Sequence, residues 1–235
     1  MTLPIPDLLF TLYLLVYFPL SSLWRSRHPR PPKPDLPALR SYWRQGRYVL
    51  SLLCVFMLVK WLGGHNLVQL GLGFPSTPRA LWGLAAAAFL LVAMHLLGNR
   101  MDRKLTPEQR IKQEDKLRDS PFPMPRTQTE TLAYLVTMIG MTATWELLFR
   151  GYLLLVLTPA TGLPLAVALA AISYGAGHGY QNPKQFFGSI VAAFAFTIGY
   201  AMTGNLWWLI VLHAAAPVAM MFAARKITPR PSTDA

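Results

Sequence analysis

Residues 131–157 read TLAYLVTMIGMTATWELLFRGYLLLVL, and this stretch decides the fold class of the chain. It is longer than the roughly 20 apolar residues that a helix needs to cross a membrane. Its only two charged residues, Glu146 and Arg150, are four positions apart and therefore share one face of a helix. A charged pair at membrane depth is costly unless it is compensated, so it marks a candidate functional site. The pair alone is equally well explained as an ion pair that only fixes helix packing.

The composition extends this interpretation to the whole chain. Of its 235 residues, 53% are hydrophobic and 14% are charged, whereas a soluble domain carries about 25% charged residues. The apolar residues gather into seven stretches, so the sequence predicts an integral membrane protein, an all-α polytopic helical bundle. The predicted spans are 5–23, 48–64, 81–98, 129–157, 164–179, 186–203 and 206–224. The fourth is too long for an upright helix, and we expect it to be tilted, or broken near Gly140 or Gly151.

The basic residues set the predicted orientation. Segments 24–47, 99–128, 180–185 and 225–235 hold 19 of the 22 Lys and Arg residues, and the opposite loops hold only Arg79. Because cytoplasmic loops are enriched in Lys and Arg, seven alternating spans predict an external N-terminus and a cytoplasmic C-terminus. The net charge of +12 is thereby explained by loop charge. No helix-turn-helix or zinc-finger spacing accompanies it, so we expect membrane lipid and not nucleic acid as a partner.

The chain divides into three segments. Residues 1–128 hold the first three spans and the basic loops, residues 129–224 hold the spans with polar residues, and residues 225–235 form a short basic tail. The first span has no basic leader and is interpreted as retained. The single Cys54 excludes an intrachain disulfide. Thr106 begins a predicted short surface helix, and Thr127 with Glu130 fits a capping box that opens the fourth span.

Two histidines add to the Glu146–Arg150 pair. His178 ends the fifth predicted span within SYGAGHGYQN, and His213 lies inside the seventh within LWWLIVLHAAAP. A lone histidine on an apolar helix is usually a packing residue. Two histidines and a carboxylate on three spans are a less ordinary set, because together they can hold a metal ion or activate a water molecule.

These segments resemble the CPBP family, which comprises CAAX prenyl proteases and bacteriocin-processing, Abi-type membrane proteins. Its first motif, Glu-Glu-x-x-x-Arg followed by Gly-Tyr/Phe-Leu, is similar to Trp145-Glu-Leu-Leu-Phe-Arg150-Gly-Tyr-Leu. Its second motif, Phe-x-x-x-His, is similar to Tyr174-Gly-Ala-Gly-His178. Its third motif, a histidine followed four residues later by Asn or Asp, is similar to His213 and the residues after it. The resemblance covers roughly residues 129–220.

Two family positions are substituted in this chain. Trp145 stands where the family has the glutamate that activates the attacking water. Pro217 stands where it has the Asn or Asp that polarises the scissile carbonyl. The resemblance therefore implies Glu146, His178 and His213 as the catalytic residues, with Arg150 and Tyr174 in support.

The resemblance implies an intramembrane endopeptidase that hydrolyses a peptide or protein substrate near the membrane surface, in a bacterial cytoplasmic membrane. It leaves open whether zinc takes part, with Glu146, His178 and His213 as candidate ligands, because a glutamate mechanism needs no metal. The alternative is a catalytically inactive homologue that acts as a membrane regulator, immunity factor or scaffold, which the substitutions at Trp145 and Pro217 favour. A third interpretation is a helical membrane protein whose polar residues only lock packing.

Overall fold

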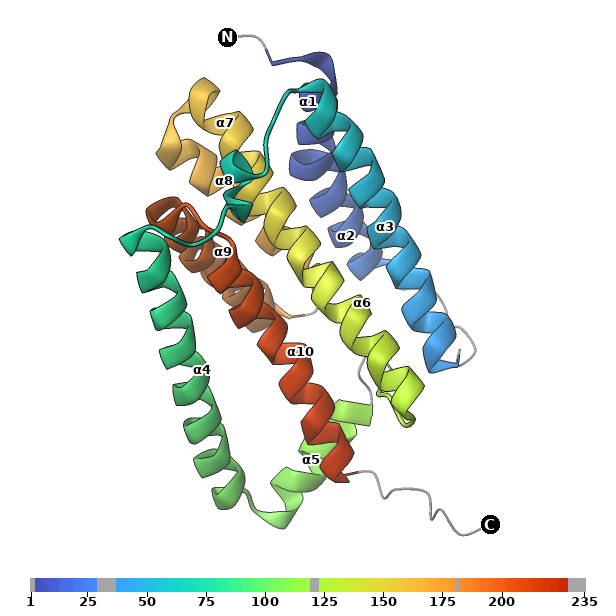
Figure 1. Ribbon diagram of the computed structural model, residues 1–235. Coiled ribbons are helices and arrows are strands. Elements are labelled where there is room, and N and C mark those ends of the chain that lie inside the picture. The colour runs from blue at the N-terminus through green and yellow to red at the C-terminus, as the bar shows by residue number, and fades with distance from the viewer. Residues whose placement is uncertain (1–2, 29–36, 119–122, 181, 228–235) are drawn as a thin grey trace.

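The computed structural model describes residues 3–28, 37–118, 123–180 and 182–227, and every regular element in these ranges is a helix (Figure 1). The α-helices are α1 Ile5–Leu12, α2 Phe18–Arg27, α3 Ala38–Leu62, α4 Pro78–Lys104, α5 Pro107–Arg118, α6 Gln128–Glu146, α7 Leu153–Thr161, α8 Leu163–Gly177, α9 Pro183–Thr203 and α10 Trp207–Ile227. Short π-helical segments occur at η1 Tyr13–Tyr17, η2 Val68–Leu72 and η3 Leu147–Tyr152. The prediction of an all-α fold is confirmed.

Six helical segments of the described chain are long and apolar enough to cross a membrane, and they match six of the seven predicted spans. They are Ile5–Arg27, Ala38–Leu62, Pro78–Lys104, Gln128–Thr161, Pro183–Thr203 and Trp207–Ala224. The fifth predicted span corresponds to α8, which has only 15 residues and extends about 22 Å at 1.5 Å per residue. It is therefore shorter than the ~30 Å hydrocarbon core. The polytopic bundle is confirmed, and α8 agrees with the short fifth span predicted at 164–179.

The helices run in alternating directions, so that the start of α1 and the end of α10 lie at opposite ends of the bundle (Figure 1). This arrangement agrees with the prediction of seven spans that run in alternating directions. The assignment of the α10 end to the cytoplasm rests on the Lys and Arg counts and stays a prediction.

Two exposed tryptophans lie near the two ends of α3. Trp43 and Trp61 are both largely exposed and lie about 27 Å apart along the helix axis. Tryptophan is enriched at both membrane–water interfaces, and this separation is close to the ~30 Å hydrocarbon thickness. Helix α3 begins at Ala38, ten residues before the predicted start of its span, because its first turns are basic and continue the helix beyond the apolar part.

The long fourth span is neither broken nor a uniform α-helix. Helix α6 continues through η3 into α7, and the irregularity falls on η3, which includes Gly151 and not Gly140. A Cβ atom at Gly151 would lie 2.6 Å from the carbonyl oxygen of Leu70 in η2. Glycine at this position therefore allows the two π-helical segments to approach. Such π-helical turns occur frequently at functional sites.

Two predicted caps are confirmed. The Thr127 Oγ1 accepts a hydrogen bond from the Glu130 amide, and the Glu130 carboxylate accepts one from the Thr127 amide. Glu130 is thus part of a capping box at the start of α6. Thr106 and Gln109 make the same reciprocal pair of bonds at the start of α5. Glu130 and Thr106 are therefore explained as residues that cap the N-terminal ends of α6 and α5.

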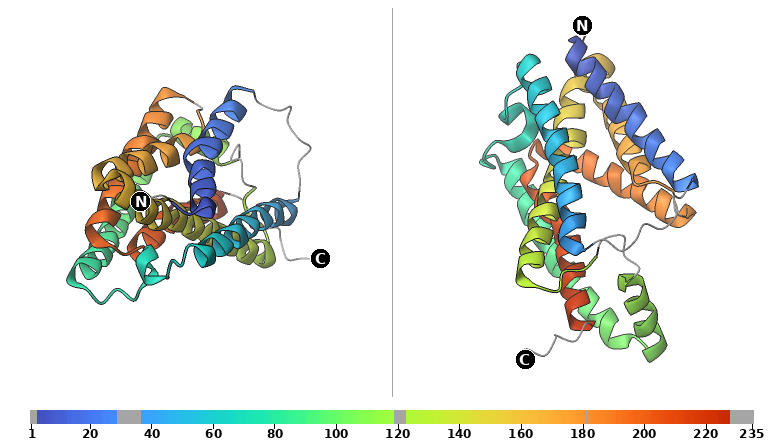
Figure 2. Two further views of the ribbon diagram at one scale, coloured as in Figure 1. Left: turned by 90° about the horizontal axis from the view of Figure 1, so that it is seen from above. Right: turned by 90° about the vertical axis from the view of Figure 1, so that its right-hand side faces the viewer.

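Helix α6 and η3 lie in the middle of the bundle. Helix α6 packs against α3 and α10, while η3 contacts η2, α8 and α9. Helix α2 packs along α8, and α1 contacts α3. Helices α2 and α3, by contrast, diverge toward the α2 C-terminus (Figure 2). All six residues of η3 are consequently buried.

Candidate active site

Glu146 and Arg150 lie at the junction of α6 and η3, and neither side chain is accessible to solvent. The Arg150 Nη1 donates a hydrogen bond of 3.3 Å to the Glu146 Oε1. The predicted i, i+4 ion pair is therefore formed and fully buried. Such a pair has lost its hydration on both sides, and its net contribution to stability is small or unfavourable unless other bonds compensate.

The Glu146 carboxylate has a second partner on another helix. His213, on α10, donates from its Nδ1 to the same Oε1 over 2.7 Å. The His213 side chain is 27% exposed, while Glu146 is completely buried. The carboxylate thus joins α6 to α10. With Nδ1 donating, the Nε2 of a neutral imidazole carries the lone pair.

His178 and Tyr174 form the other half of the site, at the C-terminal end of α8. The His178 Nδ1 lies 3.1 Å from the Tyr174 carbonyl oxygen. A carbonyl only accepts hydrogen bonds, so Nδ1 is the donor and the Nε2 of a neutral ring is the acceptor. The Tyr174 ring is stacked by the Arg150 guanidinium, whose central carbon lies 3.9 Å from the ring centroid, a cation–π contact.

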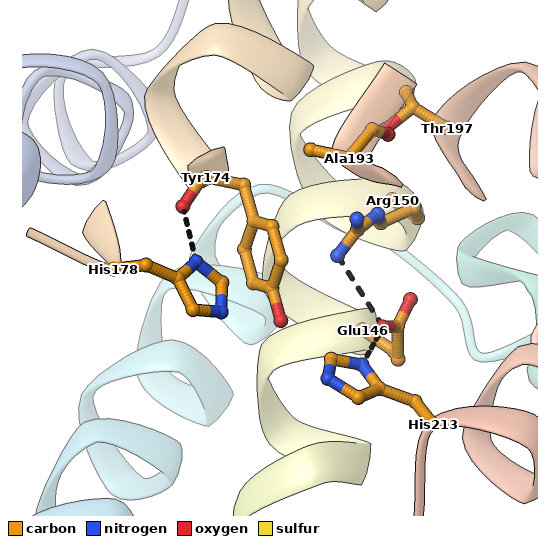
Figure 3. Close-up of polar contacts among 7 residues, drawn as sticks. All are labelled: Glu146, Arg150, Tyr174, His178, Ala193, Thr197 and His213. Atoms are coloured by element: carbon orange, nitrogen blue, oxygen red, sulfur yellow. Dashed lines mark hydrogen bonds and ion pairs between the residues drawn. The ribbon is translucent and has the colours of Figure 1, made fainter. Parts of the chain in front are cut away.

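The structure gathers the predicted site residues around Tyr174 but does not join them all. Tyr174 lies between His178 and the group formed by Glu146, Arg150 and His213 (Figure 3). Its ring centroid is 4.8 Å from that of His178 and 6.2 Å from that of His213. Glu146 therefore contacts one of the two imidazoles directly, and the second is on the far side of an aromatic ring.

The site contains buried polar atoms without hydrogen-bond partners in the described part of the chain. They are the Glu146 Oε2 and the Arg150 Nε and Nη2. More than about nine-tenths of buried polar groups in proteins have a partner, and leaving one unpaired is costly. An acceptor and two donors in one enclosed place are suited to binding a water molecule and the carbonyl of a substrate.

Trp145 is half-buried and faces away from the polar group. Its ring packs on Phe18, with centroids 4.7 Å apart, and on Phe149 at 5.9 Å. Consecutive residues on a helix point about 100° apart, so Trp145 and Glu146 face different neighbours. The ring contacts of Trp145 are thus with aromatic neighbours and not with the Glu146 group.

Pro217 lies one helical turn after His213 on α10. Its carbonyl oxygen accepts a hydrogen bond of 3.1 Å from the hydroxyl of Tyr134, a fully buried residue of α6. Proline contributes no side-chain donor, so this position supplies a backbone acceptor to the α6–α10 contact. It offers nothing that polarises a carbonyl.

The three candidate zinc ligands do not form a zinc site in this arrangement. Zinc requires lone pairs that converge at about 2.0–2.2 Å from one point. The His213 Nδ1 is bonded to Glu146, and the His178 Nδ1 is bonded to a carbonyl across the Tyr174 ring. Among the residues that the structure describes, no three His, Cys, Asp or Glu side chains are grouped as ligands. The donor set therefore does not fit a shared metal ion.

A second buried polar cluster was missed by sequence reasoning. Asp7 in α1 is 1% exposed, and its Oδ1 accepts hydrogen bonds from the Tyr152 hydroxyl at 2.9 Å and from the His65 Nε2 at 3.0 Å. Tyr152 follows Arg150 and Gly151 in the first motif. The sequence holds one signal of this cluster, because Asp7 is an ionisable residue within an apolar span.

The fold and the site define a class of protein: an integral membrane protein of packed helices with a buried glutamate, arginine and histidine group at its centre. Residues 127–219, less than half of the chain, match the family model of the type II CAAX prenyl endopeptidase Rce1-like proteins. The match contains every predicted site residue and supports membership of the CPBP family, a family of proteases. No curated protein and no solved structure matches the chain.

Proposed function

We propose that this protein is an intramembrane endopeptidase of the CAAX-protease type, in which Glu146 activates the water that hydrolyses a peptide bond. The observation that carries the proposal is the state of the Glu146 carboxylate. One oxygen, Oε1, is held by Arg150 and His213, while the buried Oε2 has no partner in the described chain. A general base must be fixed in orientation and still have a lone pair within reach of the proton it removes.

The reaction follows from this geometry. Glu146 Oε2 accepts a proton from water, and the resulting hydroxide attacks the carbonyl carbon of the scissile bond. The tetrahedral intermediate then collapses, the C–N bond breaks, and the proton passes from Glu146 to the leaving nitrogen. The products are a carboxylate and an amine. Arg150 and His213 keep the carboxylate in place during both proton transfers.

His178 orients the attacking water in this proposal. Its Nδ1 donates to the Tyr174 carbonyl, so the Nε2 of the neutral ring accepts a hydrogen bond. That atom is suited to the second proton of the water. Stabilising an oxyanion would require the Nε2 to carry a proton as well.

Arg150 supplies the oxyanion donors that Pro217 does not. Its Nε and Nη2 are buried donors without a protein partner in the described chain, and its charge is permanent. Donors of this kind lower the barrier of acyl transfer, and loss of one costs ~10²–10³ in rate. The Tyr174 ring under the guanidinium fixes its plane.

A second function is favoured by a specific observation. The family's usual base position, Trp145, is packed into an aromatic cluster with Phe18 and Phe149. In addition, His178 is separated from Glu146 by the Tyr174 ring. These contacts support a non-catalytic homologue that binds a peptide or protein partner as a membrane regulator, immunity factor or scaffold.

The substrate and the membrane in which the reaction occurs are also part of the proposal. We infer that the substrate is a peptide or protein that reaches the membrane surface, and that the membrane is a bacterial cytoplasmic membrane. The basic predicted cytoplasmic loops support contact with lipid headgroups.

The test is hydrolysis by the purified chain reconstituted in lipid vesicles. Matched prenylated and unprenylated peptides are offered in ¹⁸O-labelled water, and products are identified by mass spectrometry. The proposal predicts cleavage with one ¹⁸O atom in the new carboxylate, and loss of that product in Glu146→Ala and His178→Ala. A folded wild-type protein that cleaves none of the peptides, while still binding one of them, would favour the non-catalytic function.

A further inference from the structure

A large groove lies along α1, η1 and α2, outside the candidate active site. Its volume is about 1380 Å³, and its wall is formed mainly by apolar residues of these three segments, with Tyr48 of α3 on the other side. Toward the C-terminus of α2, this helix diverges from α3 (Figure 2). Pockets for small molecules measure roughly 300–1,000 Å³, so this groove is large enough for a ligand with long chains.

The groove is long enough to accommodate an acyl chain of one membrane leaflet. Its apolar wall includes Leu9, Leu12, Val16 and Leu20, and from Leu9 to Arg25 the helix extends about 24 Å. This is longer than the hydrocarbon depth of one leaflet, ~15 Å, half of the ~30 Å core. The exposed apolar side chains along this wall are in the part of the chain that crosses the membrane.

The charge of the groove is confined to one end. Arg25 and Arg27 line it at the C-terminal end of α2, and both are exposed. The Arg25 guanidinium is directed back along the helix by hydrogen bonds from Nε to the Ser21 carbonyl at 3.0 Å and from Nη2 to the Ser21 hydroxyl at 3.2 Å. The exposed Trp24 beside them is a residue typical of the membrane–water interface.

We infer that this groove binds an anionic phospholipid of the surrounding bilayer, with its acyl chains along the apolar wall and its phosphate at Arg25 and Arg27. Guanidinium groups bind phosphate through charge-assisted, often paired hydrogen bonds. Basic pockets between transmembrane helices on the cytoplasmic side are suited to anionic headgroups. The inference is independent of proteolysis, because it rests on the groove and not on Glu146.

Phe18 connects the groove to residues near the candidate active site. Phe18 lines the groove, and the opposite side of its ring packs on Trp145 at 4.7 Å and on Phe149 at 5.7 Å. A Cβ atom at Gly177 would lie 2.2 Å from the Phe18 ring, so the ring is held close to the end of α8. A bound lipid therefore contacts the residue that supports Trp145 and the helix carrying His178.

The experiment is a lipid titration of the purified full-length chain in detergent, followed by native mass spectrometry. The probes are phosphatidylglycerol and phosphatidylcholine with identical acyl chains. We expect phosphatidylglycerol to bind at least about tenfold more tightly. We expect the double variant Arg25→Gln/Arg27→Gln to lose this preference, since each arginine near an anionic surface contributes roughly a fivefold effect. Val16→Trp, which fills the groove, should weaken binding of both lipids.

The matched control is Arg100→Gln/Arg103→Gln, which removes two exposed arginines at the end of α4, on the same predicted side of the membrane. Thermal unfolding in lipid-free detergent checks that all variants are folded. Equal binding of the two lipids by the wild type, or an equal loss in the control, would overturn the inference. So would displacement of phosphatidylglycerol by an S-farnesylated peptide, which would make the groove a substrate site, or a lipid-free dimer that buries it.

Discussion

The Glu146 carboxylate and the His213 imidazole are joined by a hydrogen bond of 2.7 Å although they are 67 positions apart in the sequence. The bond runs from His213 Nδ1 to Glu146 Oε1 and connects α10 to the end of α6. It orients the carboxylate, and the His213 Nε2 takes no part in this bond. The proposed chemistry depends on this contact, because it fixes one carboxylate oxygen while the other, also buried, has no hydrogen-bond partner in the described chain.

Trp145 tests whether the family's usual base position is needed. In Trp145→Glu we expect no gain in peptide cleavage, because the new side chain would enter the Phe18–Phe149 cluster and not the Glu146 group. Loss of two ring contacts, each contributing about 0.5–1.5 kcal/mol, should lower the unfolding temperature. Trp145→Phe is the control and should keep most of the stability. Cleavage by Trp145→Glu, where the wild type is inert, would support the non-catalytic function of the natural chain.

Arg150 tests the energetic coupling of the buried pair. Arg150→Met leaves Glu146 buried without its cation, which should destabilise the protein by about 3–5 kcal/mol. The double variant Glu146→Gln/Arg150→Met removes both charges and should recover much of that loss. Chemical denaturation of the two single variants and the double variant measures the coupling. Effects that simply add would show that the 3.3 Å contact does not couple the two residues.

Gly151 tests the close approach of η2 and η3. Gly151→Ala introduces a Cβ atom 2.6 Å from the Leu70 carbonyl oxygen, a backbone atom that cannot move alone. We expect a loss of about 1–3 kcal/mol, the usual cost of overpacking, and a lower unfolding temperature. The matched control is Gly140→Ala in α6, where a Cβ atom meets nothing within 4 Å. It should be neutral or stabilising by up to ~1 kcal/mol.

Asp7 tests the second polar cluster. Asp7→Ala removes the carboxylate that accepts from the Tyr152 hydroxyl and from the His65 ring, and leaves the buried hydroxyl only the backbone carbonyl oxygen of residue 7, at 3.2 Å, as an acceptor. The expected loss of stability is about 1–3 kcal/mol, measured by thermal unfolding in detergent. Asp102→Ala, at an exposed position of α4, is the control and should change little. Unchanged stability in Asp7→Ala would mean that this cluster does not tie α1 to the motif helix.

The sequence was sufficient for the fold class because a membrane span is encoded by local hydrophobicity. Six of the seven predicted spans match helices of spanning length. Two helix ends differ from the ends of the predicted spans, because hydropathy does not report where a helix begins and ends. The basic first turns of α3 are helical but not apolar, and α8 ends at Gly177, two residues before Gly179, whose φ of +77° takes the chain out of the helix.

The site was predictable in part. Family motifs identified Glu146 and His213, and the structure brings them into contact. The position of His178 relative to Glu146 was not predictable, because it depends on how α8 packs against η3 in the bundle. The three segments proposed along the chain, 1–128, 129–224 and 225–235, stay a prediction, and the tail from residue 228 lies outside the described residues.

The Asp7 cluster shows a different reason for failure. Its three members come from α1, the segment after α3, and η3, and each alone has an ordinary explanation. Only the packing of η3 against the first helix brings Tyr152 within 2.9 Å of Asp7. Contacts of this kind depend on the order of helices in the bundle, which the hydrophobic pattern does not specify.

The central claim, that Glu146 is the base which activates water, is tested most directly by the cleavage rate of Glu146→Gln. This variant keeps the shape and the acceptor for His213 but has no carboxylate to accept a proton. With the reconstituted protein and a cleaved peptide, the account predicts that kcat/KM falls by ~10²–10⁴ while peptide binding is retained. A Glu146→Gln protein that is folded and cleaves at the wild-type rate would contradict the account.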